Sequence, residues 1–215
     1  MASNLIDVVL LAYQGVDELD LFGAWSVLRK AAEIDPDGAL PVVRMVLAAP
    51  ESFVTGSGGL VFRAEQMLDD VVPGRALVVP GGRGAAAAAR DASILSYVGE
   101  AVKRGCRVYG VCTGSLIIAA TGLTRTRSLA IHRNKREMLL DLPVNEVTTG
   151  LVEDGPFVTV GGDPAHSVKS VDLAFALLAD FAPHAVEAVG SRMELMPGRR
   201  PARLDTRAAS VSLVP

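Results

Sequence analysis

The stretch Arg107-Val-Tyr-Gly-Val-Cys-Thr-Gly-Ser115 constrains the fold of this chain more than any other part of the sequence. Its apolar beginning is typical of a short buried strand, and the residues Leu116-Ile-Ile-Ala-Ala120 that follow favour a helix. Cys112 would then occupy the sharp turn between the two elements. Gly110 and Gly114 flank this turn, where a strained backbone leaves little room for side chains. The spacing therefore predicts a strand–turn–helix unit with a nucleophile elbow at Cys112.

A thiol at this elbow would lie at the N-terminus of a helix. The positive end of the helix dipole and the unpaired backbone N–H groups there favour the thiolate over the thiol. The alternative is that Cys112 is a small buried residue, as free cysteines commonly are. The Gly-x-Cys-x-Gly spacing favours a nucleophile, and the rest of the chain has to decide between the two interpretations.

Length and composition favour one α/β domain. A chain of 215 residues can bury a substantial core, and half of its residues are hydrophobic while only 5% are aromatic. We expect a single domain over residues 1–196. The Arg- and Pro-rich residues 197–215 are expected to form an extended or disordered tail, in which Arg199, Arg200 and Arg203 are solvated.

Charge and cysteine usage bound the partners and the compartment. The net charge of −3 gives no electrostatic reason to expect nucleic acid or an anionic membrane as a partner. The N-terminus lacks the basic region of a signal peptide, and no apolar segment reaches transmembrane length without a charge or turn. Cys106 and Cys112 would lie too far apart along one strand to form a bridge, so we expect reduced thiols in a cytoplasmic protein.

Strands and helices alternate along the chain, which predicts a doubly wound, mostly parallel sheet with helices on both faces. Strands are expected over 5–12, 42–49, from Ala76 and over 107–111, and helices from near Asp20 and over 85–104, 116–121, 134–140 and 167–181. A small irregular side hairpin is expected over 54–64. A second hairpin would pair 144–149 with 156–160.

Three stretches would converge at the carboxyl ends of the strands, where such sheets bind ligands. They are the acidic turn Asp17-Glu18-Leu-Asp20, the loop residues Gly81 and Gly82, and the pair Cys112-Thr113. A carboxylate, a loop of backbone donors and a thiol are suited to nucleophilic chemistry. On the sequence alone, however, Asp20 is better interpreted as the N-cap of the helix that it begins.

At these residues the sequence resembles the ThiJ/PfpI family of the class I glutamine amidotransferase-like superfamily. The matching pieces are Leu19-Asp-Leu-x-Gly23, Ser57-Gly-Gly-Leu60, Pro80-Gly-Gly-x-Gly84, Gly110-Val-Cys-Thr-Gly-Ser115 and His132. Within the family, the Cys-Thr-Gly-Ser elbow and an Asp after the first strand are most similar to the isonitrile (isocyanide) hydratase branch. Family proteases tend to carry His directly after the cysteine, where Thr113 stands here.

The resemblance implies a role for each of these residues. Cys112 would be the nucleophile that forms a thioimidate with an isonitrile. Asp20 would protonate the carbon and then assist hydrolysis to the N-formamide. Thr113 would offer its hydroxyl. Its backbone N–H and that of Gly82 would stabilise an anion, and Gly81, Gly82 and His132 would contact the substrate. The resemblance also implies a homodimer, in which the tail over 197–215 is alternatively an arm whose Arg199, Arg200 and Arg203 latch onto the partner subunit. It implies a small electrophile as substrate and no cofactor, and no metal-ligand spacing is present in the sequence.

Two other functions stay open. A glyoxalase or deglycase of reactive dicarbonyls typically pairs the cysteine with Glu and a nearby His, so Asp20 weakens that interpretation while His132 keeps it open. The neighbouring acids Asp17 and Glu18 are interpreted as solvated, and either one is the alternative acid to Asp20. A lone His is, however, more often structural than catalytic. A non-catalytic ligand or redox sensor is the second alternative, because an exposed thiol of low pKa oxidises readily. Departures from the family pattern at Gly23-Ala24 and at Ile131-His132-Arg133 leave the natural substrate open.

Overall fold

A computed structural model describes residues 6–33, 43–162 and 168–195. The strands of the main sheet are β1 (Ile6–Leu11), β2 (Val43–Ala49), β5 (Gln66–Met67), β6 (Ala76–Val79), β7 (Arg107–Val111), β10 (Leu151–Asp154) and β11 (Phe157–Val160). They lie in the order β10-β11-β7-β6-β1-β2-β5. All neighbouring pairs are parallel except β10 with β11, so the sheet is mostly parallel, as the alternating pattern predicts.

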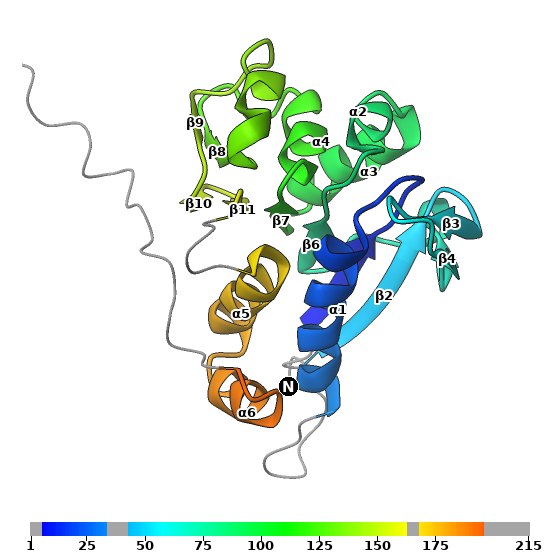
Figure 1. The fold of residues 1–215 in the computed structure, drawn as a ribbon, viewed down its shortest axis with the longest axis vertical. Coiled ribbons are helices and arrows are strands. Elements are labelled where there is room, and N and C mark those ends of the chain that lie inside the picture. The colour runs from blue at the N-terminus through cyan, green and yellow to red at the C-terminus, as the bar shows by residue number, and fades with distance from the viewer. Residues whose placement is uncertain (1–5, 34–42, 163–167, 196–215) are drawn as a thin grey trace, which may run out of the picture.

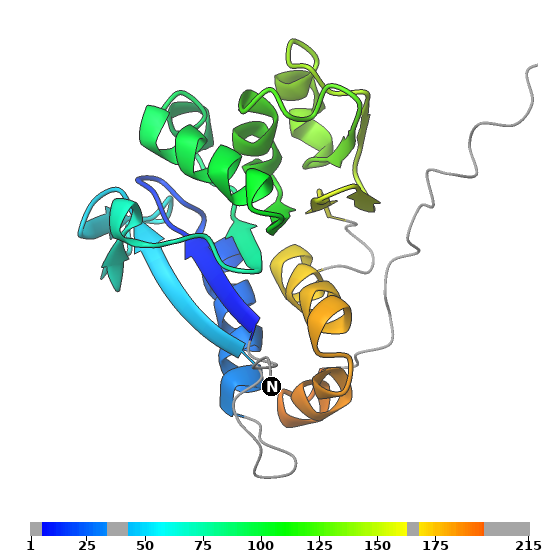
Figure 2. The same cartoon turned by 180° about the vertical axis from the view of Figure 1, so that it is seen from behind.

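Helices cover both faces of this sheet. On one side, α1 (Glu18–Glu33) packs against α5 (Lys169–Phe181) and α6 (Ala185–Arg192). The other group comprises α2 (Ala85–Ala88), α3 (Ala92–Lys103) and α4 (Gly114–Ala120), of which α3 and α4 contact β7. Figures 1 and 2 show the two groups on opposite sides of the central strands. The expected α/β architecture is thus confirmed.

The central strands are hydrophobic throughout because both of their faces are covered by helices. Every residue of β6 is buried, as are four of the five residues of β7. Tyr109 and Phe157 are among the largest fully buried side chains. This rigid centre fixes the position of the turn that follows β7.

Two small sheets flank the main one. An antiparallel hairpin of β3 (Phe53–Thr55) and β4 (Val61–Arg63) confirms the predicted side hairpin. The second small sheet pairs β8 (Ser128–Ala130) with β9 (Glu146–Thr148) in parallel. Short 3-10 helices follow β5 and β8, over Leu68–Asp70 and Arg133–Leu139. The latter occupies the place of the helix predicted over 134–140.

The expected pairing of 144–149 with 156–160 is wrong. The hairpin around Gly155 joins β10 to β11, while β9 pairs with β8 instead. Gly155 has a φ of +61°, a conformation that favours glycine in a tight turn. The strand before this turn is therefore β10, one step later in the chain than predicted.

Two helix predictions also need correction. The expected helix over 85–104 is divided, because the Asp91 side chain accepts the N–H groups of Ser93 and Ile94 and so caps a new helix, α3. Helix α6 was not predicted. The tail over 197–215 lies outside the described residues. Among the residues that are described, no helix is long and apolar enough to cross a membrane.

Candidate active site

Cys112 lies on a strained turn between β7 and α4. Its φ is +54°, a left-handed conformation that is costly for a residue with a side chain. The Cys112 N–H donates to the Val160 carbonyl at 2.8 Å, which ties the turn to β11. A side chain on Gly114 would collide with the Val79 carbonyl, and one on Gly110 would press on Ile118. The two glycines therefore allow the close packing that holds the elbow in place, as the sequence predicts.

Asp20 is not the N-cap of α1. The helix begins at Glu18, and the Asp17 carboxylate accepts the N–H groups of Leu19 at 3.0 Å and Asp20 at 3.1 Å. Asp17 thus has the capping role that we expected of Asp20. The Asp20 side chain is consequently released from the helix end, and it is buried, with a residue exposure of 1%.

Gly81 lies between the acid and the thiol. A Cβ at this position would be 2.7 Å from the Asp20 Oδ2, 2.8 Å from the Thr113 nitrogen and 2.9 Å from the Cys112 Cβ. These distances leave no room for any side chain. The loop after β6 therefore brings Asp20 and Cys112 together around a glycine.

Thr113 is joined to the same loop through Gly82. The Gly82 N–H donates to the Thr113 Oγ1 at 2.9 Å, and the hydroxyl donates to the Gly82 carbonyl at 3.2 Å. The Thr113 N–H interacts with the Cys112 thiol. Of the two amides expected to stabilise an anion, that of Gly82 is therefore already hydrogen-bonded, and a bound anion would compete with the Thr113 hydroxyl there.

Lys169 is a member of this cluster that the sequence analysis missed. Its Nζ lies 3.5 Å from the Asp20 Oδ1, and the ammonium also interacts with the Cys112 thiol. The residue is in the first turn of α5, at the same end of the sheet as the elbow. The sequence places Lys169 at the start of the helix predicted over 167–181, but no motif around Lys169 indicates a role in the site.

An open pocket of about 490 Å³ gives access to these groups. Cys112, Asp20, Thr113 and Gly82 line it together with Lys169, and its rim includes Asp17, Glu18, Ser57, Arg83, His132, Lys135 and Met138. Hence the predicted site residues Cys112, Asp20, Thr113, Gly82 and His132 line one pocket. Gly81 does not line it but packs against Asp20, Thr113 and Cys112.

Glu18 and His132 lie at the rim without reaching the thiol. The Glu18 carboxylate accepts the N–H groups of Gly58 and Leu60 in the turn between β3 and β4. His132 accepts the N–H of Asn134 through its Nδ1 at 3.2 Å, so it caps the short 3-10 helix that follows. Both interactions are structural, and they leave the His132 Nε2 as the ring nitrogen that can face the pocket.

Comparison with known proteins agrees with this geometry. The profile of the DJ-1/PfpI family matches residues 7–179. The chain belongs to the DJ-1/PfpI family. It is 28% identical to the isonitrile hydratase of Pseudomonas putida over 173 residues, which cover 80% of this chain and 70% of that protein.

Solved structures of the DJ-1/PfpI family share the fold. A ThiJ/PfpI family protein from Pseudomonas syringae superposes with a TM-score of 0.75 at 22% identity, covering 88% of this chain and 74% of that one. Drosophila melanogaster DJ-1beta gives a TM-score of 0.73 at 18% identity, covering 89% and 98% of the respective chains. These likenesses establish the α/β architecture.

Burial dominates the electrostatics of the site in this DJ-1/PfpI protein. It raises the pKa of Asp20 from 3.8 to about 6, although Lys169 partly opposes the shift. Burial, followed by the Asp20 carboxylate, also raises the pKa of the Cys112 thiol, while Lys169 lowers it. Burial and the Asp20 carboxylate therefore oppose the preference for the thiolate that the helix N-terminus favours.

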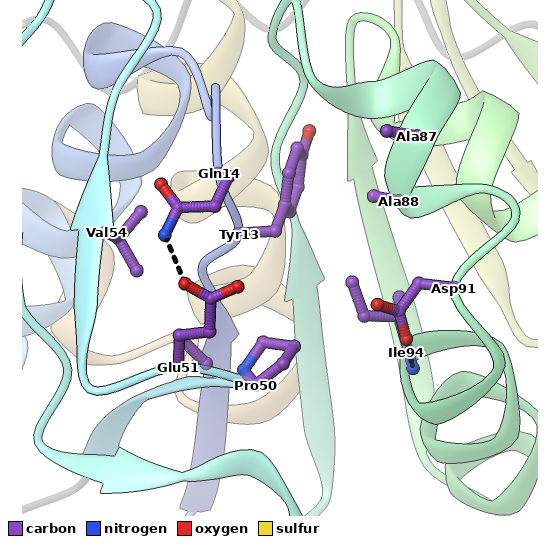
Figure 3. A pocket seen from close by; sticks show the side chains of 10 residues that line it. Tyr13, Gln14, Pro50, Glu51, Val54, Ala87, Ala88, Asp91 and Ile94 are labelled. Atoms are coloured by element: carbon purple, nitrogen blue, oxygen red, sulfur yellow. Dashed lines mark hydrogen bonds between the residues drawn. The ribbon is translucent and has the colours of Figure 1, made fainter.

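A second pocket of about 200 Å³ lies on the other side of Tyr13. Figure 3 shows Gln14 paired with Glu51 on one wall, and Ala87, Ala88, Asp91 and Ile94 on the opposite wall. The Tyr13 hydroxyl donates to the Pro80 carbonyl at 2.8 Å, which supports the loop that carries Gly81.

The two cysteines remain free thiols, as expected, and Cys106 is buried away from the pocket. Over the described ranges, no group of three or more His, Cys, Asp or Glu side chains is arranged to hold a metal ion.

Proposed function

We propose that this DJ-1/PfpI protein is a cysteine-dependent hydratase that converts isonitriles to N-formamides. The observation that carries the proposal is the meeting of Cys112, Asp20 and Thr113 around Gly81 in one pocket. The similarity to an isonitrile hydratase over 80% of the chain supports the same choice of substrate class. The wide, open pocket suits a small electrophile.

The first step joins the thiol to the terminal carbon of the isonitrile. Since the pKa of Asp20 is raised to about 6 and that of Cys112 is also raised, the pair holds one proton near neutrality. This proton passes from the thiol to Asp20 as the Sγ attacks, and Asp20 then gives it to the isonitrile carbon. A carbon–sulfur bond and a carbon–hydrogen bond form, which leaves a thioimidate and an Asp20 carboxylate.

The second step hydrolyses the thioimidate. The Asp20 carboxylate takes a proton from water as the oxygen adds to the carbon, and it passes this proton to the nitrogen. The tetrahedral adduct then collapses. Its hydroxyl proton returns to Asp20, the carbon–sulfur bond breaks, and Cys112 leaves as the thiolate. The sum is one isonitrile and one water consumed for each N-formamide produced.

Thr113 has a supporting role in this scheme. Its hydroxyl joins the elbow to the loop after β6, and its N–H faces the thiol. An amide next to the sulfur stabilises negative charge that develops there during attack and departure. The scheme therefore needs the Thr113 backbone and hydroxyl in place.

A turnover assay with a small aliphatic isonitrile tests the proposal, with formation of the N-formamide as the readout. The wild-type protein and a Cys106→Ser variant are expected to be active, whereas Cys112→Ala is expected to lose turnover. Cys106 is the matched control because it is a free, buried thiol outside the pocket. Unchanged turnover in Cys112→Ala would end the proposal.

One observation favours a second candidate. His132 lines the same pocket as Cys112, and a glyoxalase or deglycase of reactive dicarbonyls typically has a histidine near its cysteine. Turnover of methylglyoxal with no action on isonitriles would favour this alternative. Stoichiometric oxidation of Cys112 without turnover of either substrate would favour a sensor.

A homodimer and a cytoplasmic location are further proposals for this chain. Exposed apolar side chains such as Leu19, Leu60 and Val168 are available to a second copy. Sedimentation of the purified protein would report the oligomeric state directly.

A further inference from the structure

We propose that Lys169 is a positioning residue for the Cys112–Asp20 pair. Its ammonium balances the single negative charge of the pair, whichever member holds that charge, and so supports the thiolate when it attacks and when it leaves. The inference rests on the proposed function only in taking the Cys112 thiol as the reacting group.

The geometry places the Lys169 ammonium beside the Asp20 carboxylate and in the same pocket as the Cys112 thiol. Its Nζ lies 3.5 Å from the Asp20 Oδ1, where the Asp20 side chain is 2% exposed and that of Lys169 is 25% exposed. The ammonium interacts with the Cys112 thiol as well. A charge pair screened from water in this way is stronger than one at the surface. One cation is thus shared between the acid and the nucleophile.

The stem of Lys169 is held by close packing on the chain after β11. A Cβ on Gly162 would lie 2.7 Å from the Lys169 Cγ and 2.8 Å from its Cδ. Gly162 also has a φ of +107°, which favours glycine. This glycine therefore leaves the space through which the lysine reaches the elbow.

Helix α5 is fixed relative to α1 at the same point. The Ser170 hydroxyl donates to the Leu19 carbonyl at 2.8 Å, one residue before Asp20. A side chain on Gly23 would collide with the Ser170 Oγ. Hence the distance between Lys169 and Asp20 is set by contacts between the two helices, and it does not depend on a flexible loop.

The other ionisable groups around the pair do not replace this cation. From α1 and its preceding loop, the carboxylate of Asp17 adds negative charge, and Tyr13 is neutral because burial raises its pKa. From the segment after β8, burial and Lys169 lower the pKa of His132, which favours the neutral ring. Burial alone would lower the pKa of Lys169, but Asp20 and Cys112 raise it, so the ammonium stays charged. Among the described residues, Glu18, Arg83 and Lys135 are further charged groups that line the pocket, and Arg133 acts on His132.

Charge balance matters because the first proposed step moves a proton from Cys112 to Asp20 and the second releases Cys112 as a thiolate beside Asp20. Transfer of the thiol proton to Asp20 moves the negative charge from oxygen to sulfur without changing the net charge. A cation that contacts both atoms stabilises either form and keeps the rearrangement small. Without it, the buried pair would favour binding a second proton, and the thiolate would become rare.

The test is the pH dependence of Cys112 alkylation by iodoacetamide in a Cys106→Ser background. Lys169→Met keeps the packed stem and removes the charge. We expect it to raise the apparent pKa of Cys112 by about one unit and to lower the alkylation rate near neutrality about tenfold. Lys169→Arg should recover most of this loss. Lys30→Met is the matched control, because Lys30 pairs with Glu33 far along α1 at 3.3 Å.

A wild-type alkylation profile in Lys169→Met would overturn the proposal, as would equal losses in Lys169→Met and Lys169→Arg. Lys169→Gln replaces the methionine variant if thermal unfolding shows that the latter does not fold. A merely structural role would lower the melting temperature without moving the pKa of the thiol. Because alkylation needs no isonitrile, a shifted profile in a protein without hydratase activity would refute the proposed substrate and leave the role of Lys169 intact.

Discussion

The Thr113 hydroxyl accepts the N–H of Gly82 at 2.9 Å and donates to the carbonyl of the same residue at 3.2 Å. This double contact joins the elbow to the loop after β6, from which Gly81 approaches the Cys112 side chain. The threonine after the cysteine is thus a brace between two parts of the site. The contribution of the Thr113 hydroxyl to turnover can be separated from that of the Thr113 methyl group.

Thr113→Val should lower hydratase turnover, because it removes the brace and leaves the Gly82 N–H without its partner. Loss of one buried hydrogen bond costs about 1–3 kcal/mol, which corresponds to roughly ten- to hundredfold in rate if it is expressed in the transition state. Thr113→Ser keeps the hydroxyl and should retain most of the activity. Comparison of kcat/KM for the two variants checks this, and a loss in Thr113→Ser as large as that in Thr113→Val would show that the hydroxyl is not sufficient to hold the site.

Gly81→Ala should disturb the site and destabilise the fold. The new Cβ would lie 2.7 Å from the Asp20 Oδ2 and 2.9 Å from the Cys112 Cβ, so the loop or the elbow must move. Overpacking of this kind costs about 1–3 kcal/mol. Thermal unfolding and the alkylation rate of Cys112 should both report the change.

Gly99→Ala is the matched control for this substitution. Gly99 is inside α3, and a Cβ there would meet no atom within 4 Å. Because alanine favours helix, this variant should be stabilised by about 0.5–1 kcal/mol. A Gly81→Ala protein as stable and as reactive as Gly99→Ala would contradict the account of the site.

The elbow and the sheet could be predicted from the sequence because their signals are local. The glycines two residues before and after Cys112 indicate a tight turn, because its geometry depends on these neighbours alone. Apolar runs such as Ala76–Val79 indicate strands that are buried on both faces. The position of Lys169 could not be predicted in this way. It depends on how α5 crosses α1, through the Ser170–Leu19 contact, and no local pattern encodes that crossing.

The errors have physical causes as well. Asp17 and Asp20 are both acids near a helix start, and the pattern alone does not decide which of them caps α1. The prediction of a thiolate at Cys112 considers one helix dipole, whereas burial and the Asp20 carboxylate raise the pKa of this thiol. Pairing of β9 with β8 joins segments about eighteen residues apart, which turn signals do not specify.

Asp20 should make the stability of the protein depend on pH. Burial raises its pKa from 3.8 to about 6, so between these values the folded protein holds a proton that the unfolded chain has released. The resulting stabilisation is fully present below pH 3.8 and is lost as the pH rises through about 6. The difference between the two pKa values corresponds to a change of about 3 kcal/mol in the free energy of unfolding.

Asp20→Asn removes this dependence. The difference in free energy of unfolding between wild type and Asp20→Asn, measured with urea on both sides of the window from 3.8 to about 6, should change by an amount of that order. Other acids contribute equally to both proteins and cancel in the difference. A difference that stays constant across the window would show that Asp20 titrates normally in the folded state.

Glu18 should control the mobility of the turn at the pocket rim. Its carboxylate accepts the N–H groups of Gly58 at 2.8 Å and Leu60 at 3.4 Å. Hydrogen bonds from its own backbone N–H and from these two amides lower the pKa of Glu18. A lowered pKa means that the interaction is present above the ordinary pKa of the acid and is lost as the pH falls through the lowered value.

Glu18→Gln should therefore reduce the hydrogen-exchange protection of the Gly58 and Leu60 amides near neutral pH. In the wild type the same protection should fall only at acidic pH, when the carboxylate takes up a proton. Glu51→Gln is the matched control, because the Glu51 carboxylate bonds the Gln14 side chain and not the turn. If protection of Gly58 were the same in all three proteins, the hairpin would be held by its backbone pairing alone, and Glu18 would be a solvated acid at the rim.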